Sequence, residues 1–325
     1  MMMQAILQTQ LGGVETLYLG EAAMPTPGPE QLLVRVWAAG VNRADIVQRQ
    51  GKYPAPPGVS PLLGLEISGE VEAMGEAVEG FTLGDSVFGL VGGGGYAEFA
   101  LLDASCASIK PDWLSHHEAA SLPEAWMTAW FNLIELANLK VGERILIHAG
   151  ASGVGAAAIQ LSALHGAEVV CTVGSEDKAD FCRRLGAHTA INYHEKDFTD
   201  AVKALGGANV ILDCIGAAYL DRNLQCLQVD GRLVMIGLMG GANASLDLGR
   251  LLVKRLSLRG STLRAQTESV KARLSVALRE HVLLAIQAGQ VQVTVDKIFP
   301  LAAVQTAHRF LEENHNRGKI ILTLD

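Results

Sequence analysis

The residues best suited to chemistry form a glycine-rich turn between two apolar segments. Residues 143–161 read ERILIHAGASGVGAAAIQL. We predict a short buried strand over residues 144–149 and an Ala-rich helix over residues 153–164. The turn between them contains Gly150, Ser152 and Gly155. A strand, a tight glycine turn and a helix open a dinucleotide-binding βαβ unit, in which a pyrophosphate lies against the free N–H groups of the helix start.

Two registers of the glycine pattern are open at this turn. The strict pattern G-x-G-x-x-G would need glycine where the chain has Ser152. The register Gly150-x-Ser152-x-x-Gly155 keeps the loop short and lets the Ser152 hydroxyl donate to a phosphate. A later register, Gly153-x-Gly155-x-x-Ala158, starts far from the strand. We favour the first, and the phosphate-binding residues that we expect are Gly150, Ser152, Gly153, Val154 and Gly155.

The composition is that of a globular protein with a large core. The chain has 325 residues, 49% hydrophobic and 18% charged, with a net charge of −8, which speaks against nucleic acid as a main partner. Its five cysteines contain no C-x-x-C pair, and no signal peptide is recognised at the start, so a reduced cytoplasmic protein is expected. Residues 145–167 carry no Asp, Glu, Lys or Arg, but their glycines and strand–turn–helix pattern indicate buried α/β core, not a membrane span.

The elements that must position the turn fall into two groups along the chain. Residues 1 to about 110 read as mainly β, with strands expected over 4–8, 17–22, 31–38, 66–73, 85–90 and 96–102. Helical spacing begins at residues 115–121 and 124–137, after which strands and helices alternate. The expected strands are 144–149, 168–173, 189–192, 209–213, 232–236 and 257–261, and the expected helices are 153–164, 176–185, 197–205, 217–227 and 247–254.

This alternation predicts an α/β fold with a doubly wound, parallel, six-stranded Rossmann sheet. A long amphipathic helix follows at 268–288, and residues 319–324 form a last apolar strand that has no place in that sheet. We expect it to return to the N-terminal β domain. The predicted domains are therefore 125–267 for the dinucleotide and 1–124 plus 268–325 for the mainly β domain.

Several motifs in this order carry a family resemblance. They are VNRADIVQRQGKYP (41–54), LGLEISGEV (63–71), GGGGYAEFA (92–100), LPEAWMTAW (122–130), HAGASGVGAAAIQL (148–161), LDCIGA (212–217) and RGKIIL (317–322). Together they resemble the zinc-independent, zeta-crystallin-like quinone oxidoreductase family of the medium-chain dehydrogenase/reductase superfamily. The nearest likeness is to its tumour-suppressor-inducible subgroup. The resemblance covers nearly the whole chain and implies a GroES-like fold for the β domain, which would be the catalytic one.

The chain departs from the zinc-dependent members of that superfamily. Those enzymes hold a catalytic zinc with Cys and His near the positions of residues 42–45 and 65–66, where this chain has neither. The four-cysteine lobe of their structural zinc is absent from the sequence too. His116 and His117 are adjacent and cannot easily chelate one ion. We expect no metal site.

The second strand of the Rossmann sheet bears on the choice of cofactor. NAD enzymes usually carry Asp or Glu at its tip, whereas residues 168–173 are followed by Gly174 and Ser175, with Lys178 one turn beyond. A 2′-phosphate would suit Ser175 and Lys178, so NADPH is predicted over NADH. Glu176 and Asp177 leave a ribose contact open, and Lys178 could instead be a solvated helix lysine. The resemblance points to NADPH as well, and adds Tyr193 beside the adenosine phosphate.

Further cofactor contacts are expected at the carboxyl ends of the strands. They are Ile215, Gly237, Leu238, Met239, Ser261, Thr262 and Leu263. By resemblance, Arg317 and Lys319 approach the cofactor from the C-terminal segment, and Thr128 lies near the nicotinamide. A helix-start hydroxyl bonded to backbone is the alternative reading of Thr128.

The predicted chemistry is hydride delivery to an acceptor that is already electrophilic. Without a Lewis acid, oxidation of a simple alcohol would need a strong base, and none is evident. Hydride delivery to a quinone or an α,β-unsaturated carbonyl is easier. By resemblance, Asn42, Asp45 and Tyr53 line the substrate side, and with Thr128 they form the expected catalytic set. Tyr53 could bond the acceptor oxygen or stack on a flat ring, and Asn42 could orient it. Asp45 has an equally good structural reading, and residues 92–95 are either a mobile lid or a turn.

The leading prediction is thus an NADPH:quinone oxidoreductase acting on a small-molecule quinone or enone. One alternative is an enone or enoyl reductase with the same hydride chemistry. Another is a low-turnover NADPH-binding protein of the crystallin or RNA-binding kind, against which the acidic balance speaks. By resemblance we also expect a homo-oligomer, in which the edge strand at 257–261 pairs across a two-fold axis, because an exposed sheet edge needs cover. A homodimer is the expected form, and the sequence does not distinguish it from a tetramer. No nucleic acid or membrane is expected as a partner.

Overall fold

The computed structural model describes residues 1–324, which form two compact units. Unit 1 comprises residues 1–127, 264–284 and the segment from 293 onward, and unit 2 comprises 128–263 and 285–292. The division predicted from the sequence, at 124/125 and 267/268, differs from this one. Residues 125–127 and 264–267 group with unit 1, and residues 285–292, expected in the β domain, group with unit 2.

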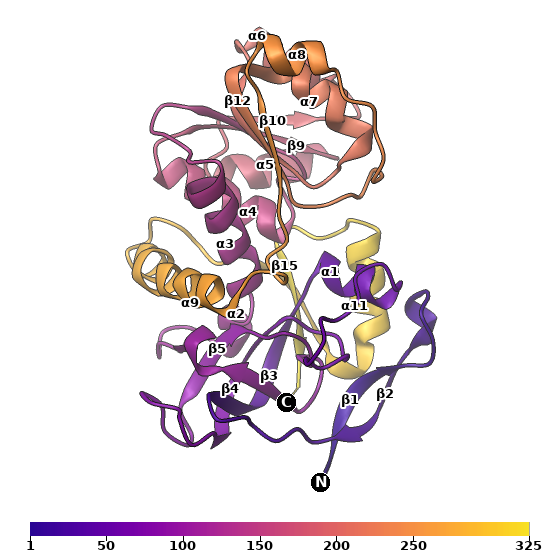
Figure 1. The fold of residues 1–325 in the computed structure, drawn as a ribbon, viewed down its shortest axis with the longest axis vertical. Coiled ribbons are helices and arrows are strands. Elements are labelled where there is room, and N and C mark those ends of the chain that lie inside the picture. Colours follow the sequence, from indigo (N-terminus) through magenta and orange to yellow (C-terminus); the bar gives the residue numbers. More distant parts are fainter. Residues whose placement is uncertain (325) are drawn as a thin grey trace. The chain divides into compact units, whose positions relative to one another are not determined.

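Unit 1 is built on a seven-stranded sheet in the order β14-β15-β3-β4-β5-β7, with β6 paired to β3 (Figure 1). Its strands are β3 (Gln31–Val41), β4 (Glu66–Met74), β5 (Ser86–Leu90), β6 (Phe99–Asp103), β7 (Ala107–Ile109), β14 (Val295–Pro300) and β15 (Lys319–Thr323). The antiparallel strands β1 (Met2–Gln8) and β2 (Leu17–Ala23) form a separate pair. Strand β15 lies between β14 and β3, which confirms that the C-terminal strand returns to the N-terminal β domain.

Within residues 1–324, five α-helices lie wholly or mostly in unit 1. They are α1 (Arg43–Arg49), α2 (His116–Ala119), α3 (Pro123–Trp130), α9 (Glu268–Ala277) and α11 (Val304–Glu312). Helix α11 packs on α1 and turns Val304, Ala307 and Leu311 into the core of the unit. Strands β7 and β14 and helix α11 were not predicted. The helix expected over 124–137 is α3 followed by a wider turn at Phe131–Leu136, and that expected over 268–288 is α9, a wider turn and α10 (Leu284–Gln287).

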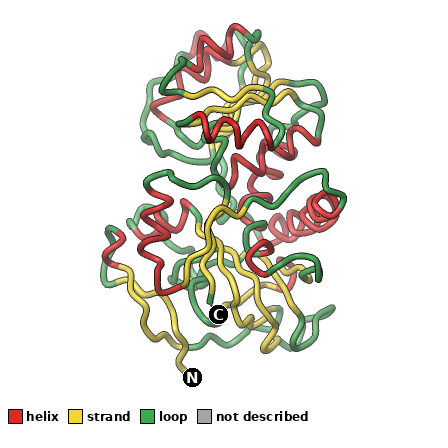
Figure 2. The backbone as a smooth tube through the Cα atoms, turned by 180° about the vertical axis from the view of Figure 1, so that it is seen from behind, coloured by secondary structure: helices red, strands yellow, loops and turns green. Residues whose placement is uncertain are grey.

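Unit 2 contains the predicted parallel six-stranded sheet, in the order β10-β9-β8-β11-β12-β13. Its strands are β8 (Arg144–Ile147), β9 (Glu168–Val173), β10 (Thr189–Asn192), β11 (Ala208–Asp213), β12 (Leu227–Met235) and β13 (Ser257–Gly260). Its helices are α4 (Gly153–Leu164), α5 (Glu176–Arg184), α6 (Phe198–Ala204), α7 (Leu220–Cys226) and α8 (Leu248–Val253). Helices lie on both faces of this sheet (Figure 2), as a doubly wound fold requires.

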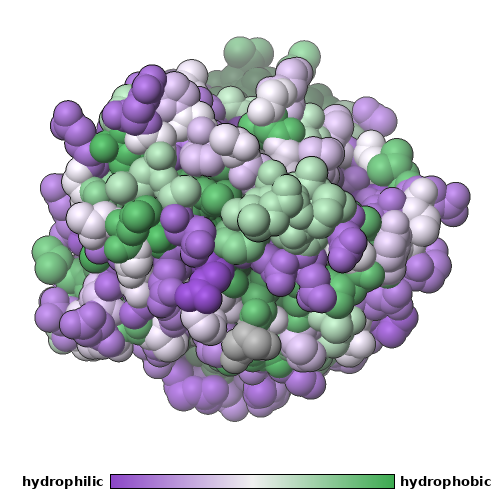
Figure 3. Space-filling model, turned by 90° about the horizontal axis from the view of Figure 1, so that it is seen from below, coloured by the Kyte–Doolittle hydropathy of each residue, from purple (hydrophilic) through white to green (hydrophobic). Residues whose placement is uncertain are grey.

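Each unit has its own apolar core. In unit 1 the core includes Leu32, Val34 and Ile67 of the sheet, and in unit 2 it includes Leu146, Val170 and Ile211. On the face shown in Figure 3, hydrophobic and hydrophilic side chains are interspersed. Within residues 1–324, no helix is both long and apolar enough to cross a membrane.

Candidate active site

The glycine turn of unit 2 connects β8 to α4. Ser152 caps the helix, and its Oγ accepts a hydrogen bond from the Gly155 N–H at 3.0 Å. A Cβ on Gly155 would lie 2.3 Å from the carbonyl oxygen of Ala149, so this position requires glycine. The turn is tight enough that Ala149 itself adopts a positive φ of 53°. The observed helix start after Ser152 favours the register Gly150-x-Ser152-x-x-Gly155.

This turn fits a pyrophosphate. Helix α4 has 12 residues and no acidic side chain in its first turn. Its first N–H groups, at Gly153 and Val154, have no intrahelical acceptor and point out of the helix start. The Ser152 hydroxyl accepts from Gly155 and keeps its own proton to donate. These are the donors that an anionic dinucleotide bridge needs.

The residues predicted for a 2′-phosphate follow two neighbouring strands. Strands β9 and β10 are parallel and pair Val173 with Asn192, so Gly174 and Tyr193 leave the sheet at the same edge. A Cβ on Gly174 would lie 2.6 Å from the Tyr193 hydroxyl oxygen, which shows how closely that ring approaches the backbone. Ser175 caps α5 and accepts from the Lys178 N–H at 3.3 Å.

The other predicted cofactor residues of unit 2 follow β11, β12 and β13, at the carboxyl ends of these strands. The Asp213 carboxylate accepts from the N–H groups of Ile215, at 2.7 Å, and Gly216, which fixes that loop. Burial raises the pKa of Asp213 to about 6. Gly237 packs against Cys214, and Leu238 and Met239 are about half exposed.

The last members of this set follow β13 or begin unit 2. Ser261 donates from Oγ to Asn132 Oδ1 at 2.6 Å, and Thr262 and Leu263 come directly after it. Thr128 is buried, and its carbonyl accepts from Asn132 Nδ2 at 2.8 Å. Asn132 therefore links the backbone of Thr128 to the end of β13.

Unit 1 contains a buried ionic cluster around Glu66. This side chain is fully buried at the start of β4, and its Oε1 accepts from Lys319 Nζ at 2.5 Å and Asn42 Nδ2 at 2.9 Å. Its Oε2 accepts from the Glu124 N–H at 2.8 Å, next to Pro123 at the start of α3. Lys319 also donates to Asn42 Oδ1 and the Val41 carbonyl, so its three N–H groups are all used.

Asn42 and Lys319 were predicted to touch acceptor and cofactor respectively. In the structure both are buried and hold Glu66, so we expect them to act on the site through that carboxylate. The Arg317 N–H donates to Asp296 Oδ2 at 3.1 Å, and its guanidinium is about half exposed.

Asp45 begins a chain of buried hydrogen bonds. Its carboxylate accepts from the N–H groups of Asn42 and Gly64, at 2.8 and 3.1 Å, and from the Tyr96 hydroxyl at 3.0 Å. His308 Nε2 lies 3.3 Å from that hydroxyl, and its Nδ1 lies 3.1 Å from the Arg49 guanidinium. Because arginine only donates, His308 accepts at Nδ1 and carries its proton on Nε2. The chain thus runs from Arg49 through His308 and Tyr96 to Asp45.

Burial determines the charges of Asp45 and His308 in this series of hydrogen bonds. Burial raises the pKa of Asp45 to about 6, although its three donors oppose the rise. It lowers the pKa of His308 to about 3, with help from the nearby Arg49, so the imidazole is neutral. Asp45 accepts from three donors within the fold, which supports the structural reading that the sequence left open.

Tyr53 lies beside an arginine that the sequence analysis missed. The Arg264 guanidinium is centred 5.6 Å from the Tyr53 ring. It donates to the Gly92 carbonyl, at 2.7 Å from Nη2, and to Gln48 Oε1 at 2.7 Å. Residues 93–95 are buried, and the N–H groups of Gly94 and Gly95 donate to the carbonyls of Leu62 and Gly64, which supports the reading of the four-glycine segment as a packed turn.

Glu124 is the other residue that sequence reasoning missed. It is partly exposed at the start of α3, and its pKa is raised to about 8 by burial and by the neighbouring charge of Glu66. The only sequence signal was a carboxyl directly after Pro123 in LPEAWMTAW.

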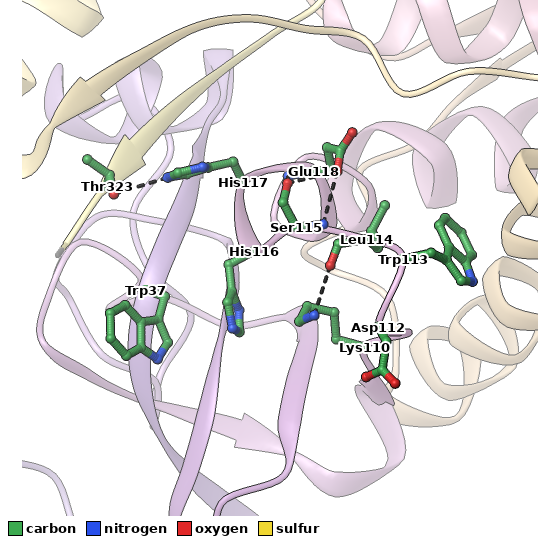
Figure 4. A pocket seen from close by; sticks show the side chains of 10 residues that line it. All are labelled: Trp37, Lys110, Asp112, Trp113, Leu114, Ser115, His116, His117, Glu118 and Thr323. Atoms are coloured by element: carbon green, nitrogen blue, oxygen red, sulfur yellow. Dashed lines mark hydrogen bonds between the residues drawn. The ribbon is translucent and has the colours of Figure 1, made fainter.

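A separate pocket of about 560 Å³ lies on unit 1 and contains none of the predicted site residues (Figure 4). Trp37 and His116 stack across it with ring centroids 6.0 Å apart. His116 is bonded to Ser68 Oγ, and His117 to Thr323 Oγ1. Across residues 1–324, no group of three or more His, Cys, Asp or Glu side chains is arranged to hold a metal ion.

Comparison with known proteins gives full-length matches. Residues 28–112 match the alcohol dehydrogenase GroES-like domain, and residues 153–278 match a family described as zinc-binding dehydrogenase. A quinone oxidoreductase of Sus scrofa is 31% identical over 99% of this chain and 98% of its own length. The Escherichia coli quinone oxidoreductase complexed with NADPH has a TM-score of 0.90 at 30% identity, over 99% of this chain and 100% of that one. The CurK enoyl reductase has a TM-score of 0.87 at 28% identity, over 99% of each chain.

Proposed function

We propose that this chain, which belongs to the medium-chain dehydrogenase/reductase superfamily, is an NADPH-dependent quinone reductase of the zeta-crystallin-like family. The glycine turn that Ser152 closes at the start of α4 carries the proposal, because it offers hydroxyl and N–H donors to a pyrophosphate. The full-length likeness to quinone oxidoreductases supports the choice of acceptor.

The residues that follow the carboxyl ends of β9 and β10 support NADPH over NADH. Gly174 and Ser175 stand where an NAD enzyme usually has a carboxylate. Ser175, Lys178 and Tyr193 would hold the 2′-phosphate through hydroxyl and ammonium donors. Bound NADPH supplies a hydride, and the protein supplies position and donors for the oxygen on which negative charge develops.

Unit 1 would supply the groups for the acceptor. Tyr53 presents a phenol and a flat ring next to the guanidinium of Arg264. Both suit a quinone, since the ring can stack on a planar acceptor and the hydroxyl can bond its oxygen. The buried Glu66–Lys319–Asn42 contacts would hold the start of α3 in place.

A reductase of enones or enoyl groups is the second candidate, favoured by the structural likeness to the CurK enoyl reductase. The same donors would stabilise the enolate formed by hydride addition to an α,β-unsaturated carbonyl. Oxidation of NADPH by a panel of ortho- and para-quinones and one enone separates the two. Turnover of a quinone supports the first proposal, turnover of the enone alone replaces it by the second, and turnover of neither refutes both.

Cofactor choice is tested by titrating the protein with NADPH and NADH. Lys178→Ala should weaken NADPH binding about tenfold or more, since a charge-assisted hydrogen bond contributes about 1.5–3 kcal/mol. NADH binding should be unchanged. Lys140→Ala is the matched control, because Lys140 is exposed before β8, at the opposite edge of the sheet. Equal binding of NADPH and NADH by the unaltered protein would refute the assignment of Ser175 and Lys178.

A further inference from the structure

Glu124 is the one carboxyl of the Glu66 cluster without a bonded side-chain partner. Within residues 1–324 its carboxyl group makes no hydrogen bond and no ion pair, whereas its N–H is bonded to Glu66 Oε2 at 2.8 Å. The side chain is partly exposed. The Glu124 carboxyl is thus held by its backbone next to another carboxylate and is partly open to solvent.

The cations near Glu124 are committed to other groups. Four charged side chains face it, namely Glu66 on β4, Asp45 on α1, Lys319 on β15 and Arg264 after β13. Lys319 Nζ donates its three N–H groups to Glu66 Oε1, Asn42 Oδ1 and the Val41 carbonyl. Arg264 donates to Gly92 and Gln48. Glu124 therefore has a carboxylate neighbour and no cation of its own, which favours its neutral, protonated form.

The protonation state agrees with this geometry. Burial and the charge of Glu66 raise the pKa of Glu124 to about 8, so the group carries a proton at neutral pH. A carboxylic acid with a pKa near the working pH is a suitable general acid, because it holds a proton and can still release it. Thr128, the residue predicted beside the nicotinamide, follows one turn later in α3.

We propose that Glu124 is the proton donor of the reduction, an assignment that rests on the proposed reductase function. Hydride addition brings two electrons to the acceptor and leaves a negative charge on its oxygen. The O–H bond of the Glu124 carboxyl then breaks, and its proton forms a new O–H bond with that oxygen. The carboxylate left behind takes a proton from water. A quinone becomes a hydroquinone in this way, and an enone becomes an enol.

The kinetic test compares the unaltered enzyme with Glu124→Gln and Glu124→Asp, using the best acceptor from the panel. We expect kcat of the unaltered enzyme to fall as the pH rises through about 8. Glu124→Gln should lower kcat about 100-fold, with little change in KM, and remove this pH dependence. Glu124→Asp should retain part of the activity and the pH dependence. Glu72→Gln is the control, since Glu72 is exposed on β4.

An unchanged kcat and pH profile in Glu124→Gln would overturn the proposal. A second measurement needs neither cofactor nor turnover. Infrared spectra of the protein alone should contain a carboxylic-acid band at pH 7 that disappears in Glu124→Gln and titrates near pH 8. Absence of this band in a folded protein refutes the role of Glu124 alone, whereas absence of all turnover in the unaltered protein refutes the reductase function.

Discussion

The ammonium of Lys319, at the start of β15, lies 2.5 Å from the carboxylate of Glu66, at the start of β4. Both side chains are buried, with 4% and 0% of their surface exposed. The pair joins the C-terminal strand to the first part of the chain, and Glu66 also binds the N–H of Glu124. Removal of either charged side chain therefore leaves the other charge buried without its counter-ion.

Lys319→Met should destabilise the protein by about 3–5 kcal/mol, because it leaves the Glu66 carboxylate buried without a counter-ion. The double variant Lys319→Met with Glu66→Gln should recover part of this loss, since the remaining buried group is neutral. Urea unfolding gives both free energies. Arg35→Met is the control, as the exposed Arg35–Glu70 pair has a similar length of 2.6 Å and should contribute less than about 1 kcal/mol. Equal losses in the two single variants would contradict a special role of burial.

Gly40→Ala should damage the same cluster from the backbone side. A Cβ at Gly40 would lie 2.1 Å from Glu66 Oε1, the oxygen that binds Lys319. Because this contact involves a fully buried carboxylate, the strand or the ion pair must shift, and we expect a loss of about 1–3 kcal/mol in thermal or urea unfolding. Gly28→Ala is the matched control, since its Cβ would meet only the flexible end of Gln31. A Gly40→Ala protein as stable as this control would show that the cluster tolerates the displacement.

The Rossmann sheet could be predicted because its signals are local. Each strand and its helix lie within one short stretch, so apolar runs, glycine turns and helix starts gave residues 153–164, 168–173 and 189–192 their observed bounds. The return of β15 followed from a similar argument, as an apolar strand without a place in that sheet.

The buried network of unit 1 could not be predicted in the same way. Lys319 is 253 residues from Glu66 and 277 from Asn42 in sequence. Such contacts leave no periodic pattern, so the contacts of Asn42 and Lys319 with each other and with Glu66 could not be read from the sequence. Glu124 was visible in a motif, but the absence of a partner for its carboxyl depends on where the other charges lie.

Tyr96→Phe should make stability more dependent on pH. It removes one of the three donors to Asp45, whose pKa burial already raises to about 6, so that pKa should rise further. A carboxyl with a raised folded-state pKa contributes stability below its unfolded pKa and loses it as the pH rises through the folded value. The variant should thus lose about 1–3 kcal/mol at pH 8 and less at pH 5, where Asp45 is protonated.

Urea unfolding at the two pH values measures this difference. Tyr18→Phe is the control, because Tyr18 is 45% exposed on β2. An equal loss at both pH values in Tyr96→Phe would mean that the hydroxyl acts on packing and not on the charge of Asp45.

The edge of the unit 2 sheet leads to a prediction about assembly. Strand β13 pairs with β12 on one side and is the last strand of the sheet, which leaves a row of backbone N–H and C=O groups for another strand. The preceding helix α8 exposes Leu248, Leu252 and Val253, with 61%, 75% and 80% of their surface accessible. An exposed edge beside exposed apolar side chains is best covered by a second copy of the same chain. We therefore expect a homodimer in solution.

Light scattering after size-exclusion chromatography should give twice the 34.5 kDa chain mass. Leu252→Glu with Val253→Glu should shift the mass toward that of one chain, whereas Leu83→Glu, at an equally exposed position of unit 1, should not. A dimer unaffected by the α8 changes would move the interface to another surface, and a monomeric unaltered protein would refute the assembly itself.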